Sequence, residues 1–233
     1  MRTNYHSKLE ENVFYHVYNR TNGKDLMFVE RENYDFFLQR WRLLLIKYVD
    51  TYAYCLMGNH FHFIICVKPV DAQFKDNVVQ EQTVAARKFI AGTISVNTFL
   101  EDQFKRFFNS YAAAFNTQQD RHGSLFQKRF KRVRLRSETH IVNKICYVHH
   151  NPIHHNMAYF YEAWRYSSYV AYTTTQPTTI ERTMGLMLFD PINEHTLKVK
   201  AFIAYHEAYK KNFSNIEYEE WEDPDDFPIL PQS

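Results

Sequence analysis

The chain of 233 residues has only three cysteines, too few for the disulfide framework of a small secreted protein, so a reducing cytoplasm is expected. No apolar run approaches the length of a membrane span, and the first residues lack the apolar segment of a secretory signal. No stretch rich in Gly, Pro or Ser marks a linker between two independent domains, and no internal repeat is visible. These absences favour a globular protein without a membrane partner.

Aromatic residues and an uneven distribution of charge are what the chain has instead. Its 20 Phe and 17 Tyr fit a dense core at least as well as they fit stacking on nucleobases. After Lys211 the tail holds seven acidic residues and no Lys or Arg, so the net charge of +2 leaves +9 on residues 1–211. A basic body favours a polyanionic partner. The acidic tail either competes for the partner's site or is only a solvated end.

The stretch from Gly58 to Val67 predicts a strand that begins with two histidines, because its Phe, Ile and Val residues favour a pleated, half-buried strand. Alternation puts His60 and His62 on one face, and it puts Phe61, Phe63, Ile65 and Val67 on the other, which is the expected core face. Two imidazoles about 7 Å apart at their Cα atoms could supply half of a metal site. Taken alone, such a pair is more often two polar residues facing water.

The order of the expected strands and helices along the chain predicts an α+β fold. Strands are expected over residues 13–18, 52–57, 60–67 and within 127–136, and helices over 31–48 and 98–118, the second capped by Thr98. This order is the split βαβ arrangement of ferredoxin-like and RRM-like proteins, a four-stranded antiparallel sheet with helices packed on it. Residues 70–97 are expected to form an excursion over one face, and about 193–211 an amphipathic helix of a C-terminal extension.

The segment from Gln127 to Arg136 is the most basic of the chain and contains no acidic residue. Val133 and Leu135 alternate there with arginines, which is typical of an edge strand with a cationic face. A run of like charge is usually only a solvated surface. Here it lies in a body that is already positive, which favours contact with phosphates.

The next segment predicts a helix that Ser137 caps and that Pro152 ends near Asn151. Tyr147 lies about 160° around this helix from Ile145, off its inward apolar stripe. Tyr147 and Asn151 are four residues apart and therefore share one helical face. An aromatic residue in such a position is often only a surface tyrosine.

Six short motifs resemble those of one family in their joint order and spacing. They are Tyr15-His16-Val17-Tyr18-Asn19-Arg20, Met57-Gly58-Asn59-His60-Phe61-His62, Phe107-Phe108-Asn109-Ser110-Tyr111, His122-Gly123-Ser124-Leu125-Phe126-Gln127-Lys128-Arg129-Phe130, Tyr147-Val148-His149-His150-Asn151-Pro152 and Trp164-Arg165-Tyr166-Ser167-Ser168-Tyr169. With them the sequence resembles the HUH single-tyrosine transposases of insertion sequences, closest to the REP-associated tyrosine transposases. Residues 1–172 would be the transposase domain, and residues 173–233 would be the extension with its helix and acidic tail.

The resemblance implies a metal-dependent enzyme that cleaves and rejoins single-stranded DNA, often beside a hairpin, through a 5′-phosphotyrosine intermediate. Tyr147 would be the nucleophile, and His60, His62 and Asn151 would hold a divalent ion, Mg²⁺ or Mn²⁺. Such an ion would withdraw charge from the phosphate and orient it. The residues expected to contact DNA are Arg20, Arg121, Lys128, Arg129, Lys131, Arg132, Arg134 and Arg136.

Several points stay open in the sequence. Where many relatives have Asn-Pro-Val-Arg-Ala, this chain continues from Asn151 to His154 and His155, so that arginine has no counterpart. A tyrosine has a reference pKa of about 10 and needs a base or a nearby cation, for which Lys144 and His140 are weak candidates. The rival functions are a domesticated nucleic-acid-binding module without cleavage and a metallohydrolase that uses water. Both a monomer and a homodimer with sites completed in trans fit the sequence.

Overall fold

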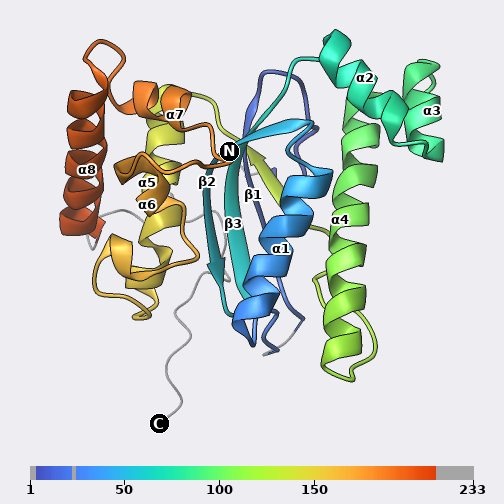
Figure 1. The fold of residues 1–233 in the computed structure, drawn as a ribbon, viewed down its shortest axis with the longest axis horizontal. Coiled ribbons are helices and arrows are strands. Elements are labelled where there is room, and N and C mark those ends of the chain that lie inside the picture. Colours follow the sequence, from blue (N-terminus) through green and yellow to red (C-terminus); the bar gives the residue numbers. More distant parts are fainter. Residues whose placement is uncertain (1–3, 23–24, 214–233) are drawn as a thin grey trace.

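The computed structural model describes residues 4–22 and 25–213 of the chain. Its centre is a four-stranded sheet in the order β2-β3-β1-β4, in which every pair of neighbours is antiparallel (Figure 1). The strands are β1 (Phe14–Arg20), β2 (Val49–Met57), β3 (His60–Val67) and β4 (Lys131–Arg134). With α1 (Arg31–Leu44) between β1 and β2, and α4 (Val96–Gln118) between β3 and β4, the predicted split βαβ arrangement is confirmed.

One face of the sheet packs against α1 and α4, which lie side by side on it (Figure 1). The core there is dominated by aromatic rings, and it receives the four side chains of β3 that alternation assigned to the core face. The indole of Trp41 stacks on the ring of Phe63 with 3.7 Å between centroids. Phe37 contacts Phe107 edge to face at 4.8 Å. Burial of this apolar area is the main way in which the α1 and α4 side of the sheet stabilises the fold.

The opposite face is covered by α5 (Glu138–His154), which contacts β2 and β3. The rest of the chain covers α5 in turn (Figure 1). It forms η1 (Tyr161–Ala163), α6 (Tyr169–Thr173), α7 (Arg182–Phe189) and α8 (His195–Asn212). Leu186, Phe189 and Phe202 share a core with α5, so this helix is buried on two sides. Two-sided burial explains why Tyr147, off the predicted stripe, is only 7% exposed.

A chain of buried hydrogen bonds joins α5 to α8. The Nδ1 atom of His149 lies 2.8 Å from Nε2 of His206, and Nδ1 of His206 lies 2.8 Å from the Phe202 carbonyl oxygen. The other ring nitrogen of His149 lies 2.8 Å from the Ser168 hydroxyl. Since the Phe202 carbonyl can only accept, His206 carries its proton on Nδ1 and His149 donates to it. Burial lowers the pKa of both histidines, so both are neutral.

Several predicted boundaries were wrong. Ser95, not Thr98, caps α4, because the Ser95 hydroxyl accepts a hydrogen bond from the Thr98 amide. The helix α5 passes through Pro152 to His154, since a proline in the last turn removes a single intrahelical bond and His155 still donates its amide hydrogen to Asn151. The helix α1 ends at Leu44, and the basic edge strand is only four residues long. The cap at Ser137 is confirmed.

The excursion over residues 70–97 consists of two short helices, α2 (Ala72–Gln80) and α3 (Val84–Ile90), the second of which packs on α4. Within the described ranges no helix combines the length and apolarity that a membrane crossing requires. Cys55, Cys66 and Cys146 are free thiols. The acidic tail lies outside the described residues, and the division of the chain at residue 172 stays a prediction.

Candidate active site

The two histidines of β3 lie under α5, on the face that alternation predicted. Their ring centroids are 5.1 Å apart; His62 is only 1% exposed and His60 is half-buried. In the strand register His60 lies opposite Arg20 and His62 opposite Tyr18. The Nε2 atom of His16, one pair further along β1, lies 2.9 Å from Nδ1 of His62. The His16–His62 contact fixes the ring of His62 in place.

The helix α5 presents Tyr147, Asn151 and His155 to this pair, each one turn after the last. The ring of Tyr147 meets that of His62 edge to face at 5.5 Å between centroids, and it meets His16 at 5.9 Å. Asn151 anchors its amide nitrogen on the Tyr147 carbonyl oxygen at 3.0 Å. The predicted nucleophile and the predicted metal-binding residues therefore come together within a single chain.

The Nε2 atom of His60 and the Oδ1 atom of Asn151 are both buried and make no hydrogen bond of ordinary geometry among the described residues, although the Asn151 side chain is near enough to the His60 ring to act on its pKa. A buried acceptor without a donor is costly, and the unmet need is what a bound ion or its water would satisfy. The opposite nitrogen of His60 lies 2.7 Å from the Asn59 side chain. That contact orients the ring as the outer partner of a ligating histidine does.

The charge state of both histidines suits metal binding. Burial, and then the neighbouring His155, lower the pKa of His60 to about 3, although the nearby Asn151 side chain opposes the shift. Burial and His16 also hold the pKa of His62 well below its ordinary value. Both rings are therefore neutral at pH 7 and have a lone pair available, which is the form that coordinates a metal.

A third histidine of the cluster is one that the sequence marked only as a departure from the family pattern. The ring of His155 lies 5.2 Å from that of His60, and both its nitrogens are buried without a hydrogen-bond partner among the described residues. Even so, no three His, Cys, Asp or Glu side chains in the described part of the chain are arranged to hold a metal ion. The cluster thus offers two imidazoles and an amide oxygen, an incomplete ligand set that solvent or substrate must complete.

A buried cation accompanies the candidate nucleophile. The ammonium of Lys144 lies 4.9 Å from the centre of the Tyr147 ring, and this lysine is only 5% exposed. A positive charge at that distance favours a tyrosinate over a neutral tyrosine. Sequence reasoning named Lys144 from its place on the helix, but it missed His16, because no spacing along the chain connects that residue to Tyr147.

The arginines and lysines expected to contact DNA are divided by the fold. Arg20 lies beside His60 in the sheet, and the Lys131 ammonium lies 5.5 Å from the centre of the Tyr18 ring. Arg132 is buried, where it pairs with Glu101 and donates to the Ser7 carbonyl.

The remaining cations of that set lie outside the cluster. Arg121 pairs with Asp25 at 2.8 Å, and Arg134 pairs with Glu10 at the same distance. Lys128 and Arg129 line a separate cavity, and Arg136 lines another at the start of α5. Arg20 and Lys131 are therefore the cations of the predicted set that the fold places against residues of the site face.

Comparisons with known proteins give one solved structure to report. No protein-family model matches the chain, and no curated protein matches it. A solved structure of a REP-associated tyrosine transposase bound to a REP hairpin is similar over 75% of this chain and 88% of its own, with 11% identity and a TM-score of 0.49. That protein belongs to the family that the sequence motifs resemble. At this level of similarity, conclusions about activity must come from the residues of this chain.

Proposed function

We propose that this protein is a metal-dependent transposase that cleaves and rejoins single-stranded DNA, beside a hairpin, through Tyr147. The observation that carries the proposal is the contact between the rings of Tyr147 and His62. Asn151 follows Tyr147 by one helical turn, and the His60 ring lies next to that of His62 on β3. Tyrosine is a nucleophile that forms covalent intermediates, and two neutral histidines beside it are what a phosphate-activating ion would need. Tyr147, His60, His62 and Asn151 all come from one chain here, which favours a site assembled within one subunit over one completed by a second.

The reaction is a transesterification in which the phosphate exchanges its ester bond to the 3′ oxygen for one to the Tyr147 oxygen. The Tyr147 oxygen attacks the phosphorus and loses its proton, and the bond from phosphorus to the 3′ oxygen breaks. The departing 3′ oxygen takes up a proton, so the products are a 5′-phosphotyrosine and a free 3′-hydroxyl. Because one phosphodiester replaces another, the 3′-hydroxyl of the same or another strand can reverse the step without ATP.

The protein's own residues would prepare this step. Lys144 would favour the tyrosinate from its position over the Tyr147 ring. His16 would hold His62 in one orientation, and Asn59 would do the same for His60. Arg20 and Lys131 would contact phosphates of the bound strand.

The residues present fit a divalent ion held by His60, His62 and Asn151, because two neutral imidazoles lie side by side and the buried Nε2 of His60 and Oδ1 of Asn151 are atoms that can act as ligands. A Mg²⁺ or Mn²⁺ ion bound there would withdraw charge from the phosphate under attack. Two imidazoles favour Mn²⁺ over Mg²⁺, since nitrogen ligands suit transition metals better than hard alkaline-earth ions.

The test is a search for a covalent protein–DNA adduct. Purified protein is incubated with Mn²⁺ and labelled DNA hairpins that carry randomised single-stranded flanks, and adducts that survive denaturing electrophoresis are counted. We expect an adduct with the natural chain and none with Tyr147→Phe, while DNA affinity changes less than about twofold. The control is Tyr159→Phe, which alters a tyrosine that is 90% exposed and should react normally.

The alternative is a single-stranded nucleic-acid-binding module that does not cleave. The observation that favours it is the lack, in the described ranges, of three His, Cys, Asp or Glu side chains arranged around one point. It predicts DNA binding without an adduct and without cut strands. A metallohydrolase would instead give cut strands but no adduct, so the same experiment separates all three.

A further inference from the structure

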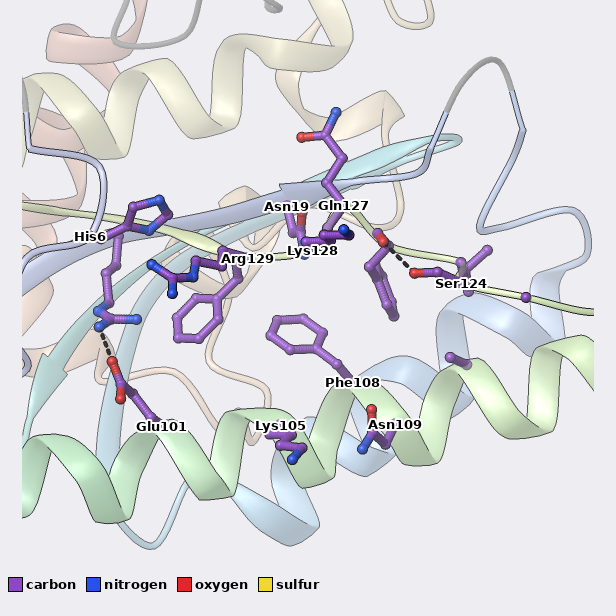
Figure 2. A pocket seen from close by; sticks show the side chains of 16 residues that line it. His6, Asn19, Glu101, Lys105, Phe108, Asn109, Ser124, Gln127, Lys128 and Arg129 are labelled. Atoms are coloured by element: carbon purple, nitrogen blue, oxygen red, sulfur yellow. Dashed lines mark hydrogen bonds and ion pairs between the residues drawn. The ribbon is translucent and has the colours of Figure 1, made fainter. Parts of the chain in front are cut away.

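A cavity of about 670 Å³ lies on the other side of the sheet from Tyr147, and nothing in the proposed chemistry uses it. One wall is the middle of α4, and the other is the segment before β4 together with the end of β1. Figure 2 shows these walls, with Lys105, Phe108 and Asn109 on the helix and Lys128 and Arg129 on the segment facing it. Its volume is within the range of pockets that bind small ligands, about 300–1,000 Å³.

The apolar lining of the cavity comes from aromatic rings. The rings of Phe108 and Phe126 have centroids 5.1 Å apart, and those of Phe108 and Phe130 are 5.4 Å apart. Phe104 stacks on the Phe130 ring with 4.7 Å between centroids, and the Arg132 guanidinium lies 5.0 Å from its centre, so only the part of this ring that stays exposed is available to a ligand. Flat rings at the edge of a cavity are the usual platform for an unpaired base, whose faces are also flat and polarisable.

The polar lining is cationic. Lys105, Lys128 and Arg129 are exposed, and no carboxylate in the described part of the chain pairs with them. The single acidic residue of the lining, Glu101, is neutralised by the buried Arg132. Burial, and then the charges of Arg132 and Arg129, lower the pKa of His6 at the edge of the cavity, as a positive local potential does.

The cavity is connected to the candidate active site through the end of β1. The Gln127 amide, on the cavity wall, donates to the Arg20 carbonyl oxygen at 2.9 Å, and Arg20 lies opposite His60 in the register. Two strand spacings, about 10 Å in the plane of the sheet, therefore separate Gln127 from His60, and a bound strand must also pass around the end of β1 because the cavity and the candidate metal site lie on opposite faces. At about 3.4 Å per stacked nucleotide, about three nucleotides cover the in-plane part of this path, so the whole path takes more than three.

We propose that this cavity binds an unpaired nucleotide of single-stranded DNA, with the base against the Phe130 and Phe108 rings and the phosphate against Lys105 and Arg129. The inference rests on the proposed function in one respect, that the bound strand continues to Tyr147. The cavity would hold the strand a few nucleotides from the scissile phosphate and so determine where it is cut. Base-paired DNA would be excluded, because its bases have no free faces to insert.

The test uses a 12-nucleotide oligodeoxythymidylate that carries one 2-aminopurine, whose fluorescence falls when the base stacks. The test variant is Lys105→Gln with Arg129→Gln, and the matched control is Lys75→Gln with Arg87→Gln, an exposed pair on α2 and α3. We expect the test variant to weaken binding at least fivefold and to reduce the salt slope by about 0.7, the value for one phosphate contact with a single strand. The control pair should bind as the natural chain does.

A third variant, Phe130→Leu, isolates stacking from charge. It should abolish most of the 2-aminopurine quenching while it changes the salt slope little. Equal affinity of the two double variants, or a 12-base-pair duplex that binds as tightly as the single strand, would overturn the cavity as a nucleotide site.

The failure of this inference can be distinguished from failure of the proposed function. At saturating DNA the Lys105→Gln, Arg129→Gln variant should still form the Tyr147 adduct, since none of the residues around Tyr147 is changed. If the natural chain forms no adduct but the cavity variants still lose affinity and quenching, the cavity binds DNA and the cleavage proposal is wrong. If adducts form but the cavity variants bind normally, the strand takes another path.

Discussion

The two faces of the sheet are both buried, but their side chains differ in kind. Under α1 and α4 the core consists of aromatic and aliphatic side chains, and its rings stack on one another. Under α5 the apolar side chains alternate with histidines, a lysine and an asparagine that are as deeply buried. Buried polar groups lower stability unless they are paired. The apolar core under α1 and α4 can therefore offset the cost of the buried reactive groups under α5.

Acid should destabilise the protein chiefly through the face under α5, and this is the largest effect we expect. Burial is the main cause of a lowered pKa in six histidines on this side, namely His60, His62, His149, His150, His155 and His206, whereas His6, which shows such a shift too, lies beside the cavity on the other side. In the unfolded chain each takes up a proton near pH 6.5. In the folded chain the pKa is about 3 for His60 and His206 and about 4 for His150 and His155, and it is well below 6.5 for His62 and His149. Stability is therefore full above pH 6.5 and is lost as the pH falls toward 4.

Each such histidine contributes up to about 1.4 kcal/mol per pH unit, so together they outweigh any single substitution. Urea unfolding at pH 7 and at pH 5, followed by far-ultraviolet circular dichroism, measures the difference. A free energy of unfolding that is the same at both pH values would mean that these histidines are not buried in their neutral form.

A substitution that creates a void in the aromatic core under α1 and α4 should lower the stability of the fold without changing adduct formation. Phe63→Ala removes the ring that stacks on Trp41 and should lower the free energy of unfolding by about 3–5 kcal/mol. Adduct formation per folded molecule should stay normal, since Tyr147 lies on the opposite face. Phe160→Ala, at a position 56% exposed, is the control and should change stability little. A specific loss of adduct in Phe63→Ala would show that the two faces are coupled.

The hydrogen bonds between α5 and α8 should contribute less to the free energy of unfolding than the aromatic core does. His206→Leu leaves Nδ1 of His149 without its acceptor and should cost about 1–3 kcal/mol. The same change at His195, which is exposed at the start of α8, serves as the control. Thermal unfolding of the two variants gives the comparison, and equal midpoints would mean that the buried pair contributes nothing to the packing of α8.

Lys144 should affect rate more than stability. Lys144→Met keeps the length of the side chain but removes its charge, so single-turnover adduct formation at pH 7 should slow about tenfold, or about 1.4 kcal/mol. The deficit should shrink as the pH rises and hydroxide takes over removal of the tyrosine proton. Lys144→Arg should restore most of the rate. A Met variant with an unchanged pH profile would remove Lys144 from the activation of Tyr147.

The local patterns of the sequence determined which face each strand residue occupies. Alternation in β3 correctly separated His60 and His62 from Phe61 and Phe63, since side chains in a strand have a fixed period of two. The cap at Ser137 and the order of strands and helices were also predicted correctly, because they depend on neighbouring residues. The fourfold spacing of Tyr147 and Asn151 was enough to place both on one side of α5.

The contacts that these strand and helix faces make with distant segments were decided only by the tertiary structure. No period in the sequence shows that α5 is covered on both sides, that His16 contacts His62, or that His155 lies beside His60. Nor does it show that Arg132 is buried against Glu101 while Arg129 lines an open cavity. The physical reason is that periodicity is set by the local backbone, whereas contacts between distant segments depend on how whole layers pack together.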